Sequence, residues 1–207
     1  METKSKVQKS HPLFQPQIAT FETMQSLWQI RESHSHKGTF GKVLLVGGSF
    51  RMQGALNMAT KACFHSGCGT LTLFTPLSSA QAIAAKNDLA MIIASPQDEE
   101  GYFANDAYLS LLDIENYRVI GCGNGMGTKE SGLPLLEKII RSGALVVLDA
   151  DGINLLAKYK EQLLALIDLR TKPVIITPHL MEFSRLTGIE VSQIQKDPLA
   201  IVHAFCL

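Results

Sequence analysis

Two glycine-rich segments contain the backbone positions that could approach a ligand most closely. The first is Gly47-Gly48-Ser49, followed by Gly54-Ala55, and the second has four glycines at alternate positions from Gly121 to Gly127. Glycine lets backbone N–H groups approach an anion or a sugar, and a helix N-terminus adds a partial positive charge. The alternatives are a plain strand-to-helix turn for the first segment and a flexible connection for the second.

Two later segments add polar side chains that could act on a ligand. In Leu148-Asp149-Ala150-Asp151, the second aspartate could cap a helix, and Asp149 could accept backbone donors or bind a water on a metal. Both aspartates could therefore be structural or contact a substrate. In Thr177-Pro178-His179, the histidine could donate to a phosphate or act as an acid or base, and Glu182 suits a first helical turn. The alternative for His179 is a ring bonded to nearby backbone.

Nucleotide-binding and metal-binding motifs of the common kinds are absent from the sequence. No Gly-Lys-Ser/Thr follows Gly48, and no GxGxxG fingerprint occurs. His34 and His36 are expected in a loop that leads into the first strand rather than at a zinc site, so we predict no metal site. The four cysteines contain no CxxC pair and are expected to be reduced and buried.

The order of apolar and amphipathic segments indicates how these residues are positioned. Apolar runs predict strands over 42–46, 70–74, 91–94, 118–121, 145–148 and 174–177. Helices are predicted over 20–31 with Thr20 as N-cap, then over 54–65, 78–86, 105–112, 133–141, 152–157 and 161–167, and from 191 onward. This alternation predicts an α/β fold with a doubly wound, mainly parallel sheet flanked by helices. Ligands bind beyond the carboxyl ends of such strands, where all the segments above fall.

Composition and charge narrow the class of protein and its partners. The chain has 46% hydrophobic and 18% charged residues, as expected for strands that are buried on both faces. Nineteen basic residues balance nineteen acidic ones, so we expect no nucleic acid and no membrane as partner. The polar start and the lack of a long apolar run favour the cytoplasm. We expect a flexible leader over 1–19 and one domain over 20–207.

Five segments in this order resemble the motifs of the NAD(P)H-hydrate dehydratases, which belong to the ribokinase-like superfamily. They are 36–41, 47–49 with 54–55, 123–127, 148–151, and 177–179 with 182–183. The resemblance implies a Rossmann-like three-layer fold and a repair reaction on hydrated NADH or NADPH. In that reaction ADP or ATP, with Mg²⁺, drives removal of water, because the 6-hydroxyl is phosphorylated and the phosphate is then eliminated.

The resemblance also implies roles for individual residues. Ala55, Gly125 and His179 match positions that contact the hydrated dinucleotide. Five weaker candidates follow strand ends or open helices: Gly48, Gly123, Asp149, Asp151 and Glu182. The resemblance further implies a homo-oligomer, a tetramer, with a small-molecule dinucleotide as partner.

The sequence departs from the family pattern in three places. Asn124 and Met126 stand in a loop that is usually Gly-Pro-Gly-Leu-Gly, and Leu180-Met181 replaces a usual Pro-Gly. Members continue with a Lys-Gly pair and a Gly-Thr-Gly-Asp turn that supplies the catalytic base and an anion hole. We therefore expect a C-terminally truncated domain with no catalytic residue, an incomplete sheet and an inactive chain. The alternatives are a non-catalytic remnant that binds a dinucleotide or joins intact subunits, and another ribokinase-like small-molecule kinase.

Overall fold

The computed structural model describes residues 19–28, 30–104 and 106–206, with the side chains of 106–108 left out. His36–Lys196 forms one compact unit, and the segments on either side of it belong to a second. The predicted leader over 1–19 lies outside the described residues, except for its last residue.

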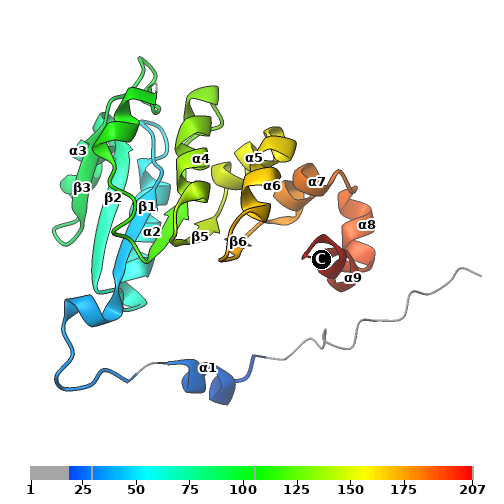
Figure 1. Cartoon of the computed structure of the whole chain (residues 1–207), viewed down its shortest axis with the longest axis horizontal. Helices are drawn as coiled ribbons and strands as arrows, with labels where there is room; N and C mark the ends of the chain where they lie inside the picture. Colours follow the sequence, from blue (N-terminus) through cyan, green and yellow to red (C-terminus); the bar gives the residue numbers. More distant parts are fainter. Residues whose placement is uncertain (1–18, 29, 105, 207) are drawn as a thin grey trace, which may run out of the picture. The chain divides into compact units, whose positions relative to one another are not determined.

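A six-stranded sheet forms the centre of the unit His36–Lys196 (Figure 1). Neighbouring strands are all parallel, in the order β3-β2-β1-β4-β5-β6. The strands are β1 (Lys42–Val46), β2 (Thr70–Pro76), β3 (Met91–Ser95), β4 (Val119–Cys122), β5 (Leu145–Leu148) and β6 (Val174–Ile176). The predicted doubly wound α/β fold is confirmed, because the apolar runs mark strands that helices cover on both faces.

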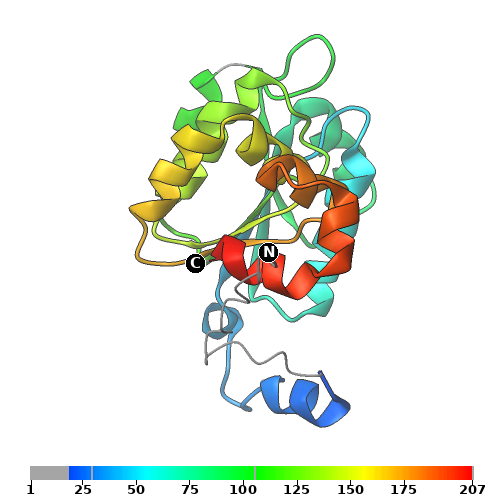
Figure 2. The same ribbon diagram turned by 90° about the vertical axis from the view of Figure 1, so that its right-hand side faces the viewer.

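Helices fill the connections β1–β2, β2–β3, β4–β5 and β5–β6, and further helices follow β6. They are α2 (Gln53–His65), α3 (Leu77–Ala84), α4 (Leu133–Arg141), α5 (Asp151–Lys158), α6 (Lys160–Asp168), α7 (Leu180–Thr187) and α8 (Val191–Lys196). Helix α2 packs on α3, and α4 packs on α6. Right-handed crossovers place these two pairs on opposite faces of the sheet, as Figure 2 shows with α4 and α6 on the left. The result is three layers.

Short 3₁₀ helices account for one difference from the predicted elements. They are η1 (Lys37–Phe40), η2 (Asp106–Leu111) and η3 (Glu130–Gly132). The segment 105–112 was expected to be an α-helix, but its described part is the tighter η2. A single apolar stretch of this length does not distinguish the two helix types.

The core lies between the sheet and its helices. Fully buried side chains include Leu44, Val46, Leu73, Phe74, Ile120, Val146, Leu148, Leu135 and Ile139. Each contributes about 1.5–3 kcal/mol when removed from water. Cys122 belongs to this core, and burial raises the pKa of its thiol to about 12, so the thiol stays protonated. The expectation that all four cysteines are buried is wrong for Cys206, which is exposed.

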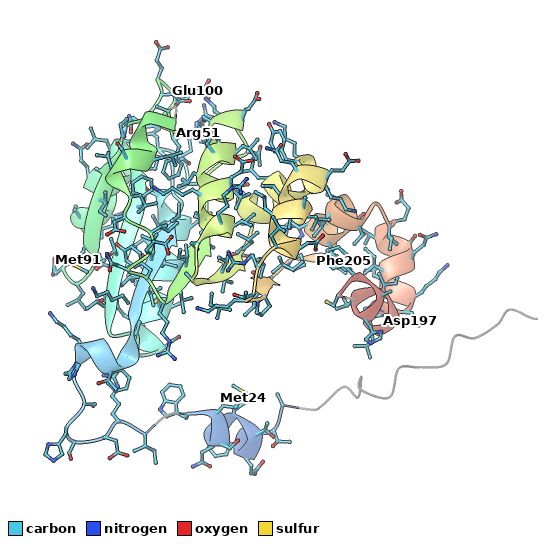
Figure 3. All side chains as sticks on the ribbon, viewed as in Figure 1. Met24, Arg51, Met91, Glu100, Asp197 and Phe205 are labelled. Atoms are coloured by element: carbon cyan, nitrogen blue, oxygen red, sulfur yellow. The ribbon has the colours of Figure 1, made fainter. Side chains whose placement is uncertain are left out.

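The described residues of the second unit contain two short helices. Helix α1 (Phe21–Leu27) has Thr20 as its N-cap, as predicted, with Thr20 Oγ1 accepting the N–H of Thr23 at 3.2 Å. The helix is shorter than the predicted 20–31, and Met24, labelled in Figure 3, is exposed. The helix predicted from 191 is two helices, because Pro198 begins α9 (Pro198–Cys206). No helix within the described ranges is long and apolar enough to cross a membrane.

Candidate functional site

The strand order reverses between β1 and β4, at the centre of the sheet. Val46 and Cys122 pair at the carboxyl ends of these two strands. The helices that follow β1 and β4 cover opposite faces, so the two connecting loops separate there. In doubly wound sheets this switch point is where ligands bind. The two glycine-rich segments of the sequence are the loops on its two sides.

The glycine loop after β4, Gly123–Gly127, is an ordered turn. The N–H of Met126 donates to the carbonyl of Gly123 at 3.3 Å, and Gly125 has φ +69°. Of the two central residues of the turn, only the one at the third position has a positive φ, which is the geometry of a type II turn and requires glycine there. The carbonyl of Asn124 accepts the N–H of Gly48 at 2.8 Å, which joins this turn to the loop after β1. The alternative of a flexible connection therefore does not apply to this segment.

A groove of about 490 Å³ lies beside this turn. One wall is a stripe of small and apolar residues along α2: Met52, Ala55, Met58, Ala59 and Ala62. The other wall is polar and comes from the ends of β4 and β5 and from α5 and α7: Asn124, Gly125, Asp149, Ala150, Asp151, Asn154 and Glu182. An apolar wall suits the face of a heteroaromatic ring, and amide and carboxylate oxygens suit sugar hydroxyls.

Two of the three predicted substrate contacts, Ala55 and Gly125, lie side by side in this groove. A Cβ built on Gly125 would lie 3.3 Å from the Cβ of Ala55. It would also lie 2.6 Å from both the Cβ and the carbonyl oxygen of Met52. Only glycine fits at 125 without moving the start of α2. The groove therefore depends on a glycine at this position.

Asp149 and Asp151 lie on the polar wall, where both are tied to neighbouring loops. Asp149 Oδ2 accepts from Asn124 Nδ2 at 2.7 Å, and Asp149 Oδ1 accepts from Thr177 Oγ1 at 2.8 Å. Asp151 Oδ2 accepts the N–H of Gly127 at 2.9 Å. The expectation that Asp151 caps a helix is wrong, because it is the first residue of α5 and Ala150 is the N-cap, with no side-chain bond.

Ala150, between these aspartates, has an uncommon backbone conformation. Its φ of 47° and ψ of −115° lie outside the regions that L-residues prefer. Among the described residues it is the one residue other than glycine with a positive φ. Such strain costs about 1–3 kcal/mol and gathers at ligand sites. Its position on the groove wall agrees with that rule.

His179, the third predicted substrate contact, caps α7. Its Nδ1 accepts the N–H groups of Met181 and Glu182 at 3.1 and 3.3 Å. With Nδ1 as acceptor, the network assigns the ring proton to Nε2, which lies 3.1 Å from Glu182 Oε1. The alternative of a histidine bonded to nearby backbone is therefore what the structure contains. His179 does not line the groove, and its side chain is 64% exposed. Its ion-pair partner Glu182, three residues later, does line the groove.

Glu182 is a buried carboxylate, and the first turn of α7 stabilises it. Only 7% of its side chain is exposed. Its Oε2 accepts the N–H of His179 at 3.0 Å, which completes a reciprocal capping box with the histidine. The predicted place of Glu182 in the first helical turn is confirmed, and the positive end of the helix dipole favours its charge there.

Two weaker candidates, Gly48 and Gly123, serve packing. Gly48 has φ +74°, and a Cβ there would lie 2.5 Å from Ser79 Oγ and 2.6 Å from Thr75 Oγ1. Gly123 has φ +125°, and its Cβ would lie 1.9 Å from the carbonyl oxygen of Asp149. Neither residue lines the groove. Both glycines let strand-end loops pack closely enough to form it.

A loop after β3 holds the far end of the glycine loop. Lys129 Nζ lies 2.6 Å from Asp98 Oδ2 and 2.9 Å from Glu100 Oε2, and it lies over the ring of Tyr102 at 4.7 Å. That ring would be 2.6 Å from a Cβ on Gly127. In the same loop, the carbonyl of Gly101 accepts a hydrogen bond from the N–H of Phe50 at 3.0 Å. In Figure 3, the labels Arg51 and Glu100 mark the loop after β1 and the loop after β3, near the top of the view.

The charges of this contact shift the pKa of both partners. Partial burial acts to raise the pKa of Asp98, but bonds from Lys129, Tyr102 N–H and Glu100 N–H together bring it below the ordinary value. The hydrogen bond to Asp98, followed by that to Glu100, raises the pKa of Lys129. The ion pair is therefore formed at neutral pH. Sequence reasoning did not find it, because its members lie 31 residues apart.

The polar wall does not present a binding site for the Mg²⁺ that the resemblance implies. Both oxygens of Asp149 accept hydrogen bonds within the protein. Across the described ranges, no three His, Cys, Asp or Glu side chains gather in a way that could hold a metal ion. The described residues therefore do not fit a magnesium site built from protein side chains alone.

Comparison with known proteins identifies the family. A family model described as NAD(P)H-hydrate dehydratase matches residues 43–206. The chain belongs to this family. It is 34% identical over 178 residues to an ADP-dependent (S)-NAD(P)H-hydrate dehydratase of Staphylococcus aureus, which covers 84% of this chain and 59% of that protein. It is 30% identical over 194 residues to a bifunctional NAD(P)H-hydrate repair enzyme of Moorella thermoacetica, covering 93% of this chain and 36% of that protein.

Solved structures that are similar to this chain share the fold. The ADP/ATP-dependent enzyme of Bacillus subtilis, co-crystallised with ATP and Mg²⁺, matches with a TM-score of 0.68 and 28% identity, over 86% of this chain and 58% of that one. A ribokinase-like protein of Enterococcus faecalis matches with a TM-score of 0.65 and 27% identity, over 79% of this chain and 54% of that one. The chain thus spans less than two thirds of the length of these relatives. The predicted family and ribokinase-like fold are confirmed.

Proposed function

We propose that the protein acts in the repair of nicotinamide nucleotides and that its groove binds hydrated NADH or NADPH. The reaction is the nucleotide-dependent dehydration that restores NADH or NADPH, with ADP as the favoured co-substrate and ATP as the alternative. The observation that carries the proposal is the meeting of Ala55 and Gly125 in one groove at the switch point of the sheet. The names of the relatives in Staphylococcus aureus and Bacillus subtilis support the reaction.

The two walls of the groove suit the two kinds of surface that a dinucleotide presents. The α2 wall offers methyl and thioether groups to the face of a ring. The opposite wall offers the Asn154 amide and the Asp151 carboxylate, which can bond to ribose hydroxyls. We assign Ala55 and Gly125 to contacts with the dinucleotide. His179 is proposed to contact it at the exposed edge of its ring, while its nitrogens hold the start of α7.

Filling the groove tests this assignment. Replacing Ala55 by Leu adds bulk between the two walls without harming α2, because leucine is a good helix former. We expect the affinity for hydrated NADH, measured by titration calorimetry, to fall at least about tenfold, since one wall becomes inaccessible. Ala84→Leu makes the same change at an exposed site on α3 and should leave affinity unaltered. Equal affinity of the Ala55 variant and the unmodified chain, with equal thermal stability, would reject the site.

The cellular setting is a separate proposal. We propose that the protein works in the cytoplasm as a homo-oligomer, a tetramer, with small molecules rather than nucleic acid as partners. The balance of nineteen basic and nineteen acidic residues supports the absence of nucleic acid. Sedimentation equilibrium of the purified chain tests the oligomer, and a monomer at all concentrations would reject it.

A further inference from the structure

Asn124 joins the loops that follow three strands, because its backbone and its side chain both form long-range hydrogen bonds. Its carbonyl accepts the N–H of Gly48 at 2.8 Å. Its Nδ2 donates to Asp149 Oδ2 at 2.7 Å, and the other oxygen of Asp149 accepts from Thr177 Oγ1 at 2.8 Å. The chain Asn124–Asp149–Thr177 therefore links the carboxyl ends of β4, β5 and β6. We call these three residues the brace.

The turn that contains Asn124 shows why the side chain matters. Asn124 is the second residue of the type II turn whose third residue is Gly125. Proline is favoured at that second position because its ring fixes φ, whereas asparagine leaves the backbone free to rotate. Three glycines within Gly123–Gly127 add further freedom. A turn of this composition needs outside restraints to hold one conformation, and the bond from Asn124 to Asp149 is the one that a side chain of the turn itself supplies.

We propose that the brace positions Gly125 for the ligand, with Asn124 as a positioning residue rather than a catalytic one. This inference rests on the proposed function, since the ligand it serves is the hydrated dinucleotide. Gly125 follows Asn124 directly and lies against Ala55 on the groove wall. When the bond to Asp149 is absent, the turn has more conformations available, and binding must restrict them again, which weakens affinity.

Three variants separate restraint of the turn from direct contact with the ligand. Asn124→Ala removes the bond to Asp149 and leaves the turn with one fewer long-range restraint, so we expect an affinity for hydrated NADH about tenfold weaker. Asn124→Pro also removes the bond but fixes φ at the second position of the turn, so this variant should bind hydrated NADH more tightly than Asn124→Ala does. Thr177→Val removes the outer bond of the brace with little change of shape, and we expect about threefold weaker binding.

A matched control repeats the asparagine-to-alanine change outside the groove. Asn116 Nδ2 donates to Asp113 Oδ2 in an exposed turn before β4, at the amino end of the strand. Asn116→Ala therefore breaks a pair of the same chemistry without touching the groove. Its affinity should equal that of the unmodified chain.

Hydrogen exchange of the amides from Gly125 to Thr128 reports the restraint without any ligand. We expect exchange to be several-fold faster in the Asn124→Ala variant and unchanged in the proline variant. Unchanged affinity and exchange on replacement by alanine would overturn the brace. Weak binding by the proline variant with slow exchange would also overturn it, because the side chain would then contact the ligand itself.

The same two measurements separate this inference from the proposed function. If the unmodified chain does not bind hydrated NADH, the proposed function is wrong. The exchange rates still decide whether the brace restrains the turn: faster exchange in both Asn124→Ala and Thr177→Val supports it, and unchanged exchange in both rejects it.

Discussion

The glycine loop Gly123–Gly127 and the histidine turn His179–Glu182, both of which the sequence marks for ligand binding, are stabilised in different ways. Long-range bonds hold the glycine loop, from Asp149 at 25 residues away and from Asp151 at 24 residues away. The histidine turn is held largely by itself, since His179 and Glu182 cap each other across three residues. A change in the first loop should therefore affect the whole groove, while a change in the second should remain local to α7.

The largest expected effect comes from Gly123→Ala, because a side chain at this position does not fit the close packing of the glycine loop. The new Cβ would meet the carbonyl oxygen of Asp149 at 1.9 Å, at a φ of +125°. We expect the free energy of unfolding to fall by about 3 kcal/mol from strain and overpacking. Urea denaturation followed by circular dichroism measures this change.

Gly54→Ala is the control for this substitution. Nothing lies within 4 Å of a Cβ built on Gly54, and it has no positive φ. Its effect on stability should stay within about 1 kcal/mol and could be favourable, because alanine is a better helix former. Equal stability of the two variants would contradict the packing role of Gly123.

A middle-sized effect is expected at His179. Replacement by Ala removes the acceptor for the N–H groups of Met181 and Glu182, so the free energy of unfolding should fall by about 1 kcal/mol. Replacement by Asn restores a capping oxygen and should recover most of this loss. Thermal unfolding of the three proteins makes the comparison.

Dinucleotide binding by the same variants sharpens the role of His179. If the ring contacts the ligand, as we propose, both variants bind more weakly than the unmodified chain. If binding by the Asn variant equals that of the unmodified chain, His179 serves only as a cap. The two roles can be told apart because asparagine can replace the capping acceptor of His179 but not the contact that its ring makes with the ligand.

The smallest effect is expected from the surface ion pair at the far end of the glycine loop. The pKa of Asp98 is lowered in the folded chain, so its contribution is complete above the ordinary aspartate pKa of about 4. That contribution is lost as the pH falls through the lower pKa of the folded state. Asp98→Asn should reduce stability slightly at pH 7, and the difference should shrink as the pH falls below the ordinary aspartate pKa or as salt is added. Thermal midpoints over a series of falling pH values test this, and a difference that does not shrink in acid would contradict it.

The parallel sheet could be predicted from sequence because its strands are short apolar runs between turn signals. The three strongest site candidates come from the resemblance and from strand-end placement. Two of them, Ala55 and Gly125, lie in one groove, whereas the cap that His179 forms on α7 was only the alternative interpretation. Whether a histidine bonds its own backbone depends on turn geometry that residue type does not reveal.

The rest of the groove could not be predicted because it depends on distant pairing. Met58, Ala59 and Ala62 repeat Ala55 at helical spacing, a signal that we interpreted only as a helix. The sequence did not indicate the role of Asn124, because its partner Asp149 follows a different strand. The contact of Lys129 with Asp98 and Tyr102 likewise joins loops that no local pattern connects.

The pairing of β1 with β4 also has a consequence for folding. Within β1–β3 and within β4–β6, each strand pairs with a strand that is next to it along the chain. The pairing of Val46 with Cys122 instead joins β1 to β4, and β2 and β3 lie between them in the sequence. Closing so long a loop is entropically costly, so we expect this seam to form late. The groove lies along the seam, and the bond between Gly48 and Asn124 crosses it. A bound dinucleotide would therefore contact both halves of the sheet and slow their separation, so that ligand affinity and resistance to unfolding rise together.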